Sequence, residues 1–147
     1  MTSIDFYFNA GDRFGVACRL AGKALRRNKR MLIYAPQPGV AQKIDRMLWA
    51  AQAVSFIPHC AAHDQLAAET PVLIAADELA RDMACAAACE VLLNLAPECP
   101  PFFERHERLL EIVAREDEEL RAGRARYAFY RERGYAIRNY DLAKAGT

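Results

Sequence analysis

The sequence predicts a Rossmann-like α/β domain with three layers, in which helices flank a mostly parallel sheet. Two observations predict this fold class: short apolar segments alternate with longer segments of helical periodicity, and the apolar segments are continuous, without period-2 alternation. No apolar run is long enough to span a membrane. Continuous apolar strands are typical of a parallel sheet that is covered on both faces. At 147 residues, 53% of them hydrophobic and 27% charged, the chain is expected to form one domain over residues 1–147.

The expected strands are runs of apolar, aromatic and β-branched residues bounded by turn-forming residues. The first run, IDFYF, is followed by the turn cluster NAGD. Another short segment is expected to be extended because the residue before Pro58 disfavours α geometry. The expected strands are residues 4–8, 29–36, 71–76 and 90–96, with the short extended segment at 55–59.

The expected helices carry apolar residues at helical spacing. In the first of them Val16, Leu20 and Ala24 form a stripe, and Asp12 is placed to cap the helix start. The alanine- and cysteine-rich segment that begins at Met83 is expected to pack on the sheet as a helix or a loop. The expected helices are residues 12–28, 39–50, 101–114 and 116–133, followed by a tail.

The amino terminus and the cysteines indicate the cellular compartment. The start, MTSIDFYFNAGDRF, has no basic region leading into an apolar stretch, so no signal peptide is expected. Five cysteines are an odd number, which argues against a disulfide framework. We therefore expect a cytoplasmic protein that does not contact membranes.

Motifs for nucleotides, metals and catalysis are incomplete. The turn NAGDRFG lacks both G-x-G-x-x-G and G-x-x-x-x-G-K-[ST], so no phosphate cradle is predicted. Cys85 and Cys89 lie four residues apart, and His59 and His63 flank Cys60, but a structural zinc site needs four converging ligands. Because the cysteine pair lies among alanines, we interpret it as packing. The sequence therefore predicts neither a metal nor a cofactor.

No nucleophile is paired with a base in the sequence. The chain has three histidines, and its two serines, Ser3 and Ser55, are not part of a G-x-S-x-G motif. The acidic run EDEEL at 116–120 lies at an expected helix start, where carboxylates compensate the helix dipole. The residues therefore favour a binding module over an enzyme.

The segment LWAAQAVSFIPH, at 48–59, is the first candidate binding surface. It contains Trp49, the single tryptophan, and Phe56, which precedes Ile57 and a proline. One interpretation is that Trp49 and Phe56 pack in the core. The other is that they form an aromatic patch for a partner protein. The residues alone leave both interpretations open.

The second candidate surface is the segment RARYAFYRERGY, at 124–135. On a helix, Arg121, Arg124, Tyr127 (or Ala128) and Arg131 fall on one face. Residues 121–138 contain six arginines and one acidic residue, whereas the whole chain has a net charge of +1. Near-neutrality argues against a protein that tracks phosphates. A solvated basic face, direct binding of single-stranded nucleic acid, and binding of an acidic peptide through arginine–carboxylate contacts remain as interpretations, of which the last fits best.

Six short segments also occur in the order and at the spacing found in one known family. They are FYF at 6–8, KRMLIYAP at 29–36, IDRMLW at 44–49, SFIPH at 55–59, PVLIA at 71–75 and RARYAFYRERGY at 124–135. Over nearly its full length the chain thereby resembles the chi subunit of bacterial DNA polymerase III. The resemblance implies a Rossmann-like fold and an accessory role in DNA replication, without an active site, in a DNA-directed DNA polymerase (nucleotidyltransferase) holoenzyme.

The resemblance also implies two protein partners. One is the psi subunit, which connects chi to the clamp loader, and the other is the acidic, phenylalanine-ended tail of the single-stranded-DNA-binding protein. Contact with DNA would then be indirect. The implied psi-subunit interface is Trp49, Phe56 and Ile57. The implied tail pocket is Arg124, Tyr127, Arg121 and Arg131, with Val113 on a preceding helix as an apolar wall.

The chain departs from the family pattern at two positions of the implied tail pocket. Ala128 stands where the family has a lysine directly after the tyrosine, and Leu120 stands where it has a basic residue one turn before the arginine. We expect Arg121 and Arg131 to replace these charges. Two alternatives are kept. The runner-up is a direct single-stranded nucleic-acid-binding protein that uses the arginines of 121–138, and a third, weaker one, suggested by the Rossmann-like layout, is a degenerate nucleotide-binding enzyme.

Overall fold

The computed structural model describes residues 1–50 and 57–143. The strands are β1 (Ser3–Ala10), β2 (Met31–Tyr34), β3 (His59–Ala61), β4 (Val72–Ala75), β5 (Val91–Asn94), β6 (Arg108–Ala114) and β7 (Ile137–Asp141). The helices are α1 (Arg13–Arg26), α2 (Val40–Ala50), α3 (Glu78–Arg81), α4 (Ala84–Ala87) and α5 (Asp117–Glu132), with 3-10 turns at Ala67–Glu69 and Phe103–Arg105.

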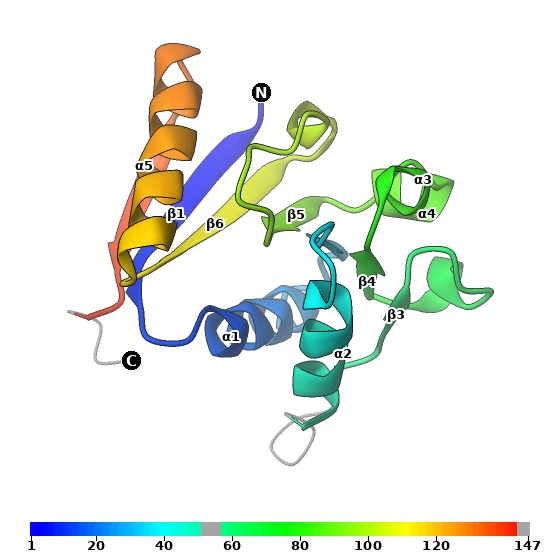
Figure 1. Ribbon diagram of the computed structural model, residues 1–147. Helices are drawn as coiled ribbons and strands as arrows, with labels where there is room; N and C mark the ends of the chain where they lie inside the picture. Colours follow the sequence, from blue (N-terminus) through cyan, green and yellow to red (C-terminus); the bar gives the residue numbers. More distant parts are fainter. Residues whose placement is uncertain (51–56, 144–147) are drawn as a thin grey trace.

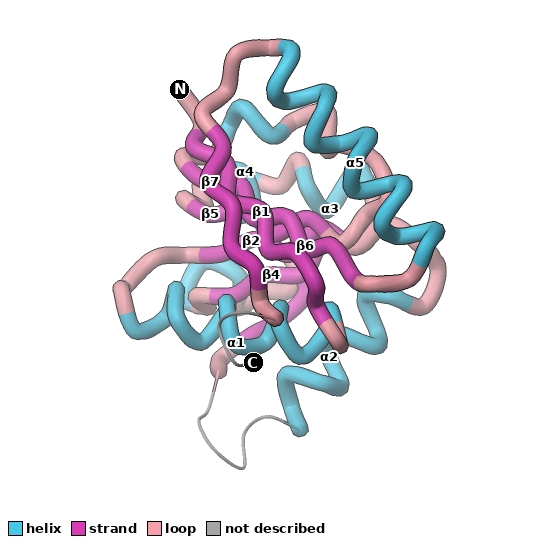
Figure 2. The backbone as a smooth tube through the Cα atoms, turned by 90° about the vertical axis from the view of Figure 1, so that its left-hand side faces the viewer, coloured by secondary structure: helices cyan, strands magenta, loops and turns pink. Residues whose placement is uncertain are grey.

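The described strands form a seven-stranded sheet in the order β3-β4-β2-β5-β6-β1-β7, and all their pairings are parallel. Helices α1 and α2 cover one face, and α5 covers the other over β1 and β6 (Figures 1 and 2). A buried cluster lies on each side of the sheet, because alternate residues of each strand point to opposite faces. The predicted fold class, a Rossmann-like three-layer α/β domain, is confirmed.

The first helix illustrates how local sequence sets an element. The Asp12 side chain accepts a hydrogen bond from the Phe14 backbone N–H at 3.1 Å, so it caps α1 as expected. Val16, Leu20 and Ala24 are all buried against the sheet. The expected helix 39–50 is likewise confirmed as α2, and the expected helix 116–133 as α5.

The prediction of a helix over residues 101–114 is wrong. Residues 103–105 form a 3-10 turn, and Arg108–Ala114 form β6, which pairs with both β1 and β5 inside the sheet. The cause is Glu111, a carboxylate in the middle of the apolar run RLLEIVA. A single charge in an apolar run is typical of a helix with one polar face. A buried strand can hold such a charge only where other residues of the fold bind the carboxylate.

The edges of the sheet also differ from expectation. Residues 137–141, expected to be part of a tail, form β7, which is paired in parallel with β1. The Arg138 Nε donates to the buried Asp5 Oδ1 at 3.0 Å, and this contact joins the two strands. At the opposite edge, the expected segment 55–59 lies partly outside the described residues, and β3 begins at His59. The segment that begins at Met83 contains the single-turn helix α4 before β5.

Candidate partner-binding site

Helix α5 is fixed to the sheet by a buried polar cluster around Glu111. The Arg126 Nε donates to Glu111 Oε1 at 2.9 Å, and the Tyr130 hydroxyl donates to Glu111 Oε2 at 2.7 Å. The Asn94 amide donates to both carboxylate oxygens, at 3.2 and 3.0 Å. Glu111 and Tyr130 are fully buried, and Arg126 is nearly so. A buried carboxylate is tolerated only with such partners.

The same cluster shifts the pKa values of two of its own residues, Glu111 and Tyr130. Burial raises the pKa of the Glu111 carboxyl, and the Arg126 guanidinium, the Tyr130 hydroxyl and the Asn94 amide oppose that rise. Burial beside the Glu111 carboxylate strongly raises the pKa of Tyr130, so its hydroxyl keeps its proton and remains a donor. The cluster therefore attaches α5 to Glu111 on β6 and, through Asn94, to β5.

Helix α5 also approaches the sheet closely at a glycine. A Cβ added to Gly123 would lie 2.7 Å from Val113 Cγ2, which is closer than side chains pack. Gly123 therefore allows the helix backbone to lie directly on β6. Val113 is 1% exposed and belongs to the core beneath α5.

A surface hollow of about 300 Å³ lies on the β7 side of α5. Helix α5 supplies two arginines, a tyrosine and an alanine, while β1 and β7 supply one residue each. The residues lining this hollow, the basic hollow, are Phe8, Arg124, Tyr127, Ala128, Arg131 and Asn139. Arg124 and Arg131 are exposed, seven residues or two helical turns apart, and they place positive charge along one side of an apolar floor.

The floor of the basic hollow is aromatic and well anchored. The Tyr127 ring packs edge-on against Phe6, with 5.1 Å between centroids, and lies 6.1 Å from Phe8. The Asn139 amide of β7 donates to the Tyr127 hydroxyl at 3.4 Å. Such a site suits a short ligand that carries carboxylates and one apolar side chain, because the arginines can bind the charges while the floor takes the side chain.

The expected tail-pocket residues are distributed as follows. The structure brings Arg124, Tyr127 and Arg131 together around the basic hollow. Arg121 is exposed on the same helix but does not line it. Val113 lies on a strand rather than on a preceding helix, and its burial beneath α5 removes it from the wall of the hollow, which corrects the expected placement.

Sequence reasoning did not find Phe8 and Asn139. Phe8 belongs to the expected strand 4–8, but its place beside α5 is set by tertiary packing, which the local sequence does not show. Asn139 was not found because β7 itself was not expected. The segment IRNYD, at 137–141, has one aliphatic and one aromatic residue and no period-2 alternation, so its local sequence gives no clear signal for a strand.

The other arginines of residues 121–138 have inward or local contacts. The Arg126 guanidinium is buried against Glu111, and the Arg138 guanidinium binds Asp5. The Arg133 guanidinium lies 3.6 Å from the centroid of the Phe129 ring. Arg121, Arg124 and Arg131 are therefore the arginines of this segment that α5 presents outward.

The second candidate surface lies at the end of α2. Trp49 is 54% exposed, and its ring packs edge-on against His59, with 5.0 Å between centroids. The His59 Nε2 lies 3.2 Å from Asp45 Oδ1, which connects β3 to α2. Ile57, expected on the same surface, is only 3% exposed and belongs to the core on the α1 side. Phe56 lies outside the described residues.

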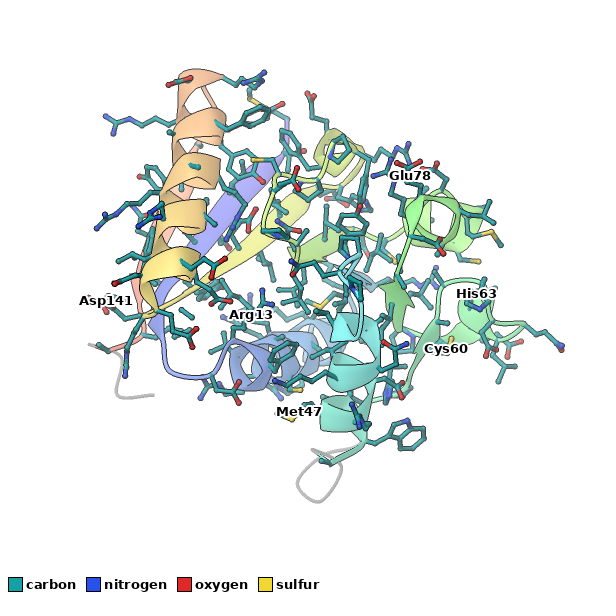
Figure 3. All side chains as sticks on the ribbon, in the orientation of Figure 1. Arg13, Met47, Cys60, His63, Glu78 and Asp141 are labelled. Atoms are coloured by element: carbon teal, nitrogen blue, oxygen red, sulfur yellow. The ribbon has the colours of Figure 1, made fainter. Side chains whose placement is uncertain are left out.

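The candidate metal ligands are not gathered into a site. Within residues 1–50 and 57–143, no group of three or more histidines, cysteines or acids is arranged to hold a metal ion. Cys60 and His63 lie near the β3 edge (Figure 3), while the Cys89 thiol donates to the Cys85 carbonyl at 3.5 Å. Burial raises the pKa of Cys89 to about 11, as for a packed thiol. Among the described helices, none has the length and apolarity needed to cross a membrane.

Comparison with known proteins assigns the family. The model of the family described as "DNA polymerase III chi subunit, HolC" matches residues 1–138. The chain belongs to the DNA polymerase III chi subunit family. It is therefore a subunit of DNA polymerase III and functions within that complex in DNA replication.

Three relatives support the assignment, and each is named DNA polymerase III subunit chi. The Pseudomonas aeruginosa protein is 32% identical over 148 residues, which cover 98% of this chain and 99% of the relative. The Escherichia coli protein is 28% identical and covers 83% of this chain and 80% of its own length. The Haemophilus influenzae protein is also 28% identical, covering 83% of this chain and 82% of its own length.

Proposed function

We propose that this chi subunit is a non-catalytic adaptor with two protein partners. Through the psi subunit it is connected to the clamp loader, and through α5 it binds the acidic C-terminal tail of the single-stranded-DNA-binding protein. The observation that carries the proposal is the basic hollow, in which two outward-facing arginines border an aromatic floor. The family resemblance supplies the two partner names, and the chemistry of the hollow supports the tail.

An acidic tail that ends in phenylalanine matches the basic hollow in both charge and shape. The tail carboxylates would accept hydrogen bonds from Arg124 and Arg131, because guanidinium groups bind carboxylates with two donors. The terminal phenylalanine would pack on Tyr127 and Phe8, which supply aromatic surface at the floor. Asn139 would hold the Tyr127 ring in the orientation that receives it.

The psi subunit is proposed to bind at the end of α2. Trp49 supports this assignment because a large aromatic side chain that is more than half exposed is typical of an interface anchor. The Asp45–His59 contact and the packing of His59 on Trp49 restrict the tryptophan before a partner arrives. A pre-ordered side chain loses less conformational entropy on binding.

Direct binding of single-stranded DNA is the second candidate function, and the exposed arginines beside aromatic residues favour it. Binding measured to two kinds of DNA distinguishes the two candidate functions: bare single strands, and the same strands coated with the single-stranded-DNA-binding protein. The adaptor requires binding to coated DNA that is lost when the coat protein lacks its terminal phenylalanine. Nanomolar binding to bare strands at physiological salt would instead support direct recognition.

The salt dependence of the binding affinity also distinguishes tail binding from direct binding of DNA. A protein that tracks phosphates releases counterions at nearly every contact, so its affinity falls steeply with salt. A tail offers few carboxylates, and its apolar anchor is insensitive to salt, so we expect a shallower dependence. The measurement should include Arg124→Ala and, as a matched control, Arg115→Ala, which removes an exposed arginine outside the basic hollow.

A further inference from the structure

Helix α5 has a second recess, on the flank opposite the basic hollow. A hollow of about 270 Å³ lies at the start of α5, and another of about 540 Å³ lies between the rest of the helix and the segment that joins β5 to β6. Both are lined by Pro97, Ala122 and Arg126, so they adjoin each other along α5, and together they are called the trough. In Figure 1 this joining segment and β7 lie on opposite sides of α5.

The middle of the trough is apolar. Pro97, Pro100 and Pro101 line the larger hollow together with Ala125 and Phe129, and Ala122 lines both hollows. Ala125 is exposed, so the apolar floor is accessible from solvent. A surface of small and flat side chains suits an extended chain segment, which can lie along the helix.

The walls of the trough are held in place by the buried cluster beneath it. The Arg126 Nη1 donates to the Pro97 carbonyl at 2.9 Å, and the Asn94 amide donates to the Glu98 carbonyl at 3.0 Å. The 97–98 wall is therefore attached to the same residues that fix α5. Because these walls are already ordered, binding to the recess loses little free energy to the ordering of side chains.

The trough is acidic, in contrast to the other flank of the helix. Its described lining includes three arginines against five glutamates: Glu98, Glu104, Glu116, Glu118 and Glu119. Arg126 is neutralised by the buried Glu111, and Arg13 pairs with Glu119 at 3.2 Å (Figure 3 labels Arg13). The Arg133 guanidinium lies over the Phe129 ring. Arg133 keeps its charge, so four glutamates, Glu98, Glu104, Glu116 and Glu118, remain against one arginine and the trough is negative.

We propose that the trough binds an extended, basic segment of a partner protein, with apolar residues at its centre and lysine or arginine toward its ends. The glutamates would meet the basic ends, and Ala125, Phe129 and the prolines would contact the centre. Phosphates and acidic peptides are disfavoured there by like charge, so the trough excludes both nucleic acid and the tail proposed for the basic hollow. The two flanks of α5 thus select partners of opposite charge.

Selection from a random peptide library tests this proposal. The library is displayed and selected on the full chain, with the acidic tail peptide present in excess to occupy the basic hollow. Enriched sequences are expected to combine lysine or arginine with an apolar centre. Enrichment of acidic sequences, or no enrichment, would overturn the proposal.

Variants then locate the selected peptide. Ala125→Tyr fills the trough, and Glu118→Lys reverses one of its charges, so each should weaken a synthetic copy of the peptide at least tenfold. Asp117→Lys is the matched control, because it makes a charge reversal in the same helical turn at a residue that does not line the trough. Equal effects of Glu118→Lys and Asp117→Lys, or no effect of Ala125→Tyr, would contradict the assignment.

Two further measurements keep this result separate from the function of the basic hollow. Melting curves show whether each variant is folded. The affinity of the tail peptide should stay within about twofold in Ala125→Tyr. If both peptides are lost from a variant that melts like the natural chain, the two flanks are not independent and the trough is not a separate site.

Discussion

The Arg126 Nε donates to Glu111 Oε1 at 2.9 Å, and both side chains lie in the core beneath α5. The arginines of residues 121–138 therefore fall into two groups: those that stabilise the fold and those that face solvent. Arg126 belongs to the first group and Arg124 to the second, although they are only two residues apart. Their substitution should therefore have opposite consequences for stability and binding.

Arg126→Ala should destabilise the fold severely. It leaves the Glu111 carboxylate buried without its counter-charge, and breaking a buried ion pair in this way costs about 3–5 kcal/mol. Urea unfolding measures the loss. Arg124→Ala is the matched control, and it should change the free energy of unfolding by no more than about 0.5 kcal/mol. Equal stabilities of the two variants would contradict the division of roles.

Gly123→Ala should destabilise the protein although alanine is the better helix former. The propensity gain is about 1 kcal/mol. The added methyl group would meet Val113 at 2.7 Å, and overpacking of this kind costs about 1–3 kcal/mol. Thermal melting of Gly123→Ala and of the double variant with Val113→Ala tests the cause. The second substitution should reduce the penalty of the first, and simple additivity of the two losses would show that the contact is not responsible.

The fold class could be predicted because most strands are continuous apolar runs and most helices carry apolar residues at helical spacing. Both patterns are visible in the local sequence. β6 was misassigned because Glu111 interrupts its apolar run, and the partners that make the charge acceptable come from β5 and α5, distant in sequence. β7 was missed because an edge strand buries little. The misplacement of Val113 and the omission of Asn139 both follow from these two errors. Arg124, Tyr127 and Arg131 were found because their spacing on one helix is local information.

Ala128→Lys should strengthen tail binding. Ala128 lines the basic hollow, is exposed, and occupies the position at which the family pattern has a lysine. An added cation near the tail carboxylates should contribute about 0.5–1 kcal/mol, because exposed ion pairs are weak. Titration with the tail peptide at low and physiological salt measures the gain, which salt should reduce. Ala136→Lys, an exposed alanine outside the hollow, is the control. An equal gain in both variants would point to net charge rather than to this site.

Trp49→Ala should impair binding of the psi subunit and spare the tail. Trp49 lies at the end of α2 on the α1 side of the sheet, whereas the basic hollow lies on α5 across it (Figure 2). Distant sites in a rigid domain act additively, so tail affinity should stay within about threefold, or roughly 0.65 kcal/mol. An interface anchor is worth about 2 kcal/mol or more.

Phe56→Ala is expected to act in the same way as Trp49→Ala. Melting curves must accompany both variants, because loss of a core residue would weaken both partners together. If a variant that melts like the natural chain loses both partners, the two-surface adaptor is wrong.

Calorimetric titration of a synthetic acidic tail peptide into the full chain measures directly whether the basic hollow binds the tail. We expect saturable binding that weakens by about 2 kcal/mol or more in Arg124→Ala, because a charge-assisted contact to a carboxylate is lost. Removal of the peptide's terminal phenylalanine should weaken binding comparably, since the aromatic floor is left uncovered. Arg115→Ala should leave the affinity unchanged. Unchanged affinity in Arg124→Ala, or binding indifferent to the terminal phenylalanine, would contradict the assignment of the basic hollow.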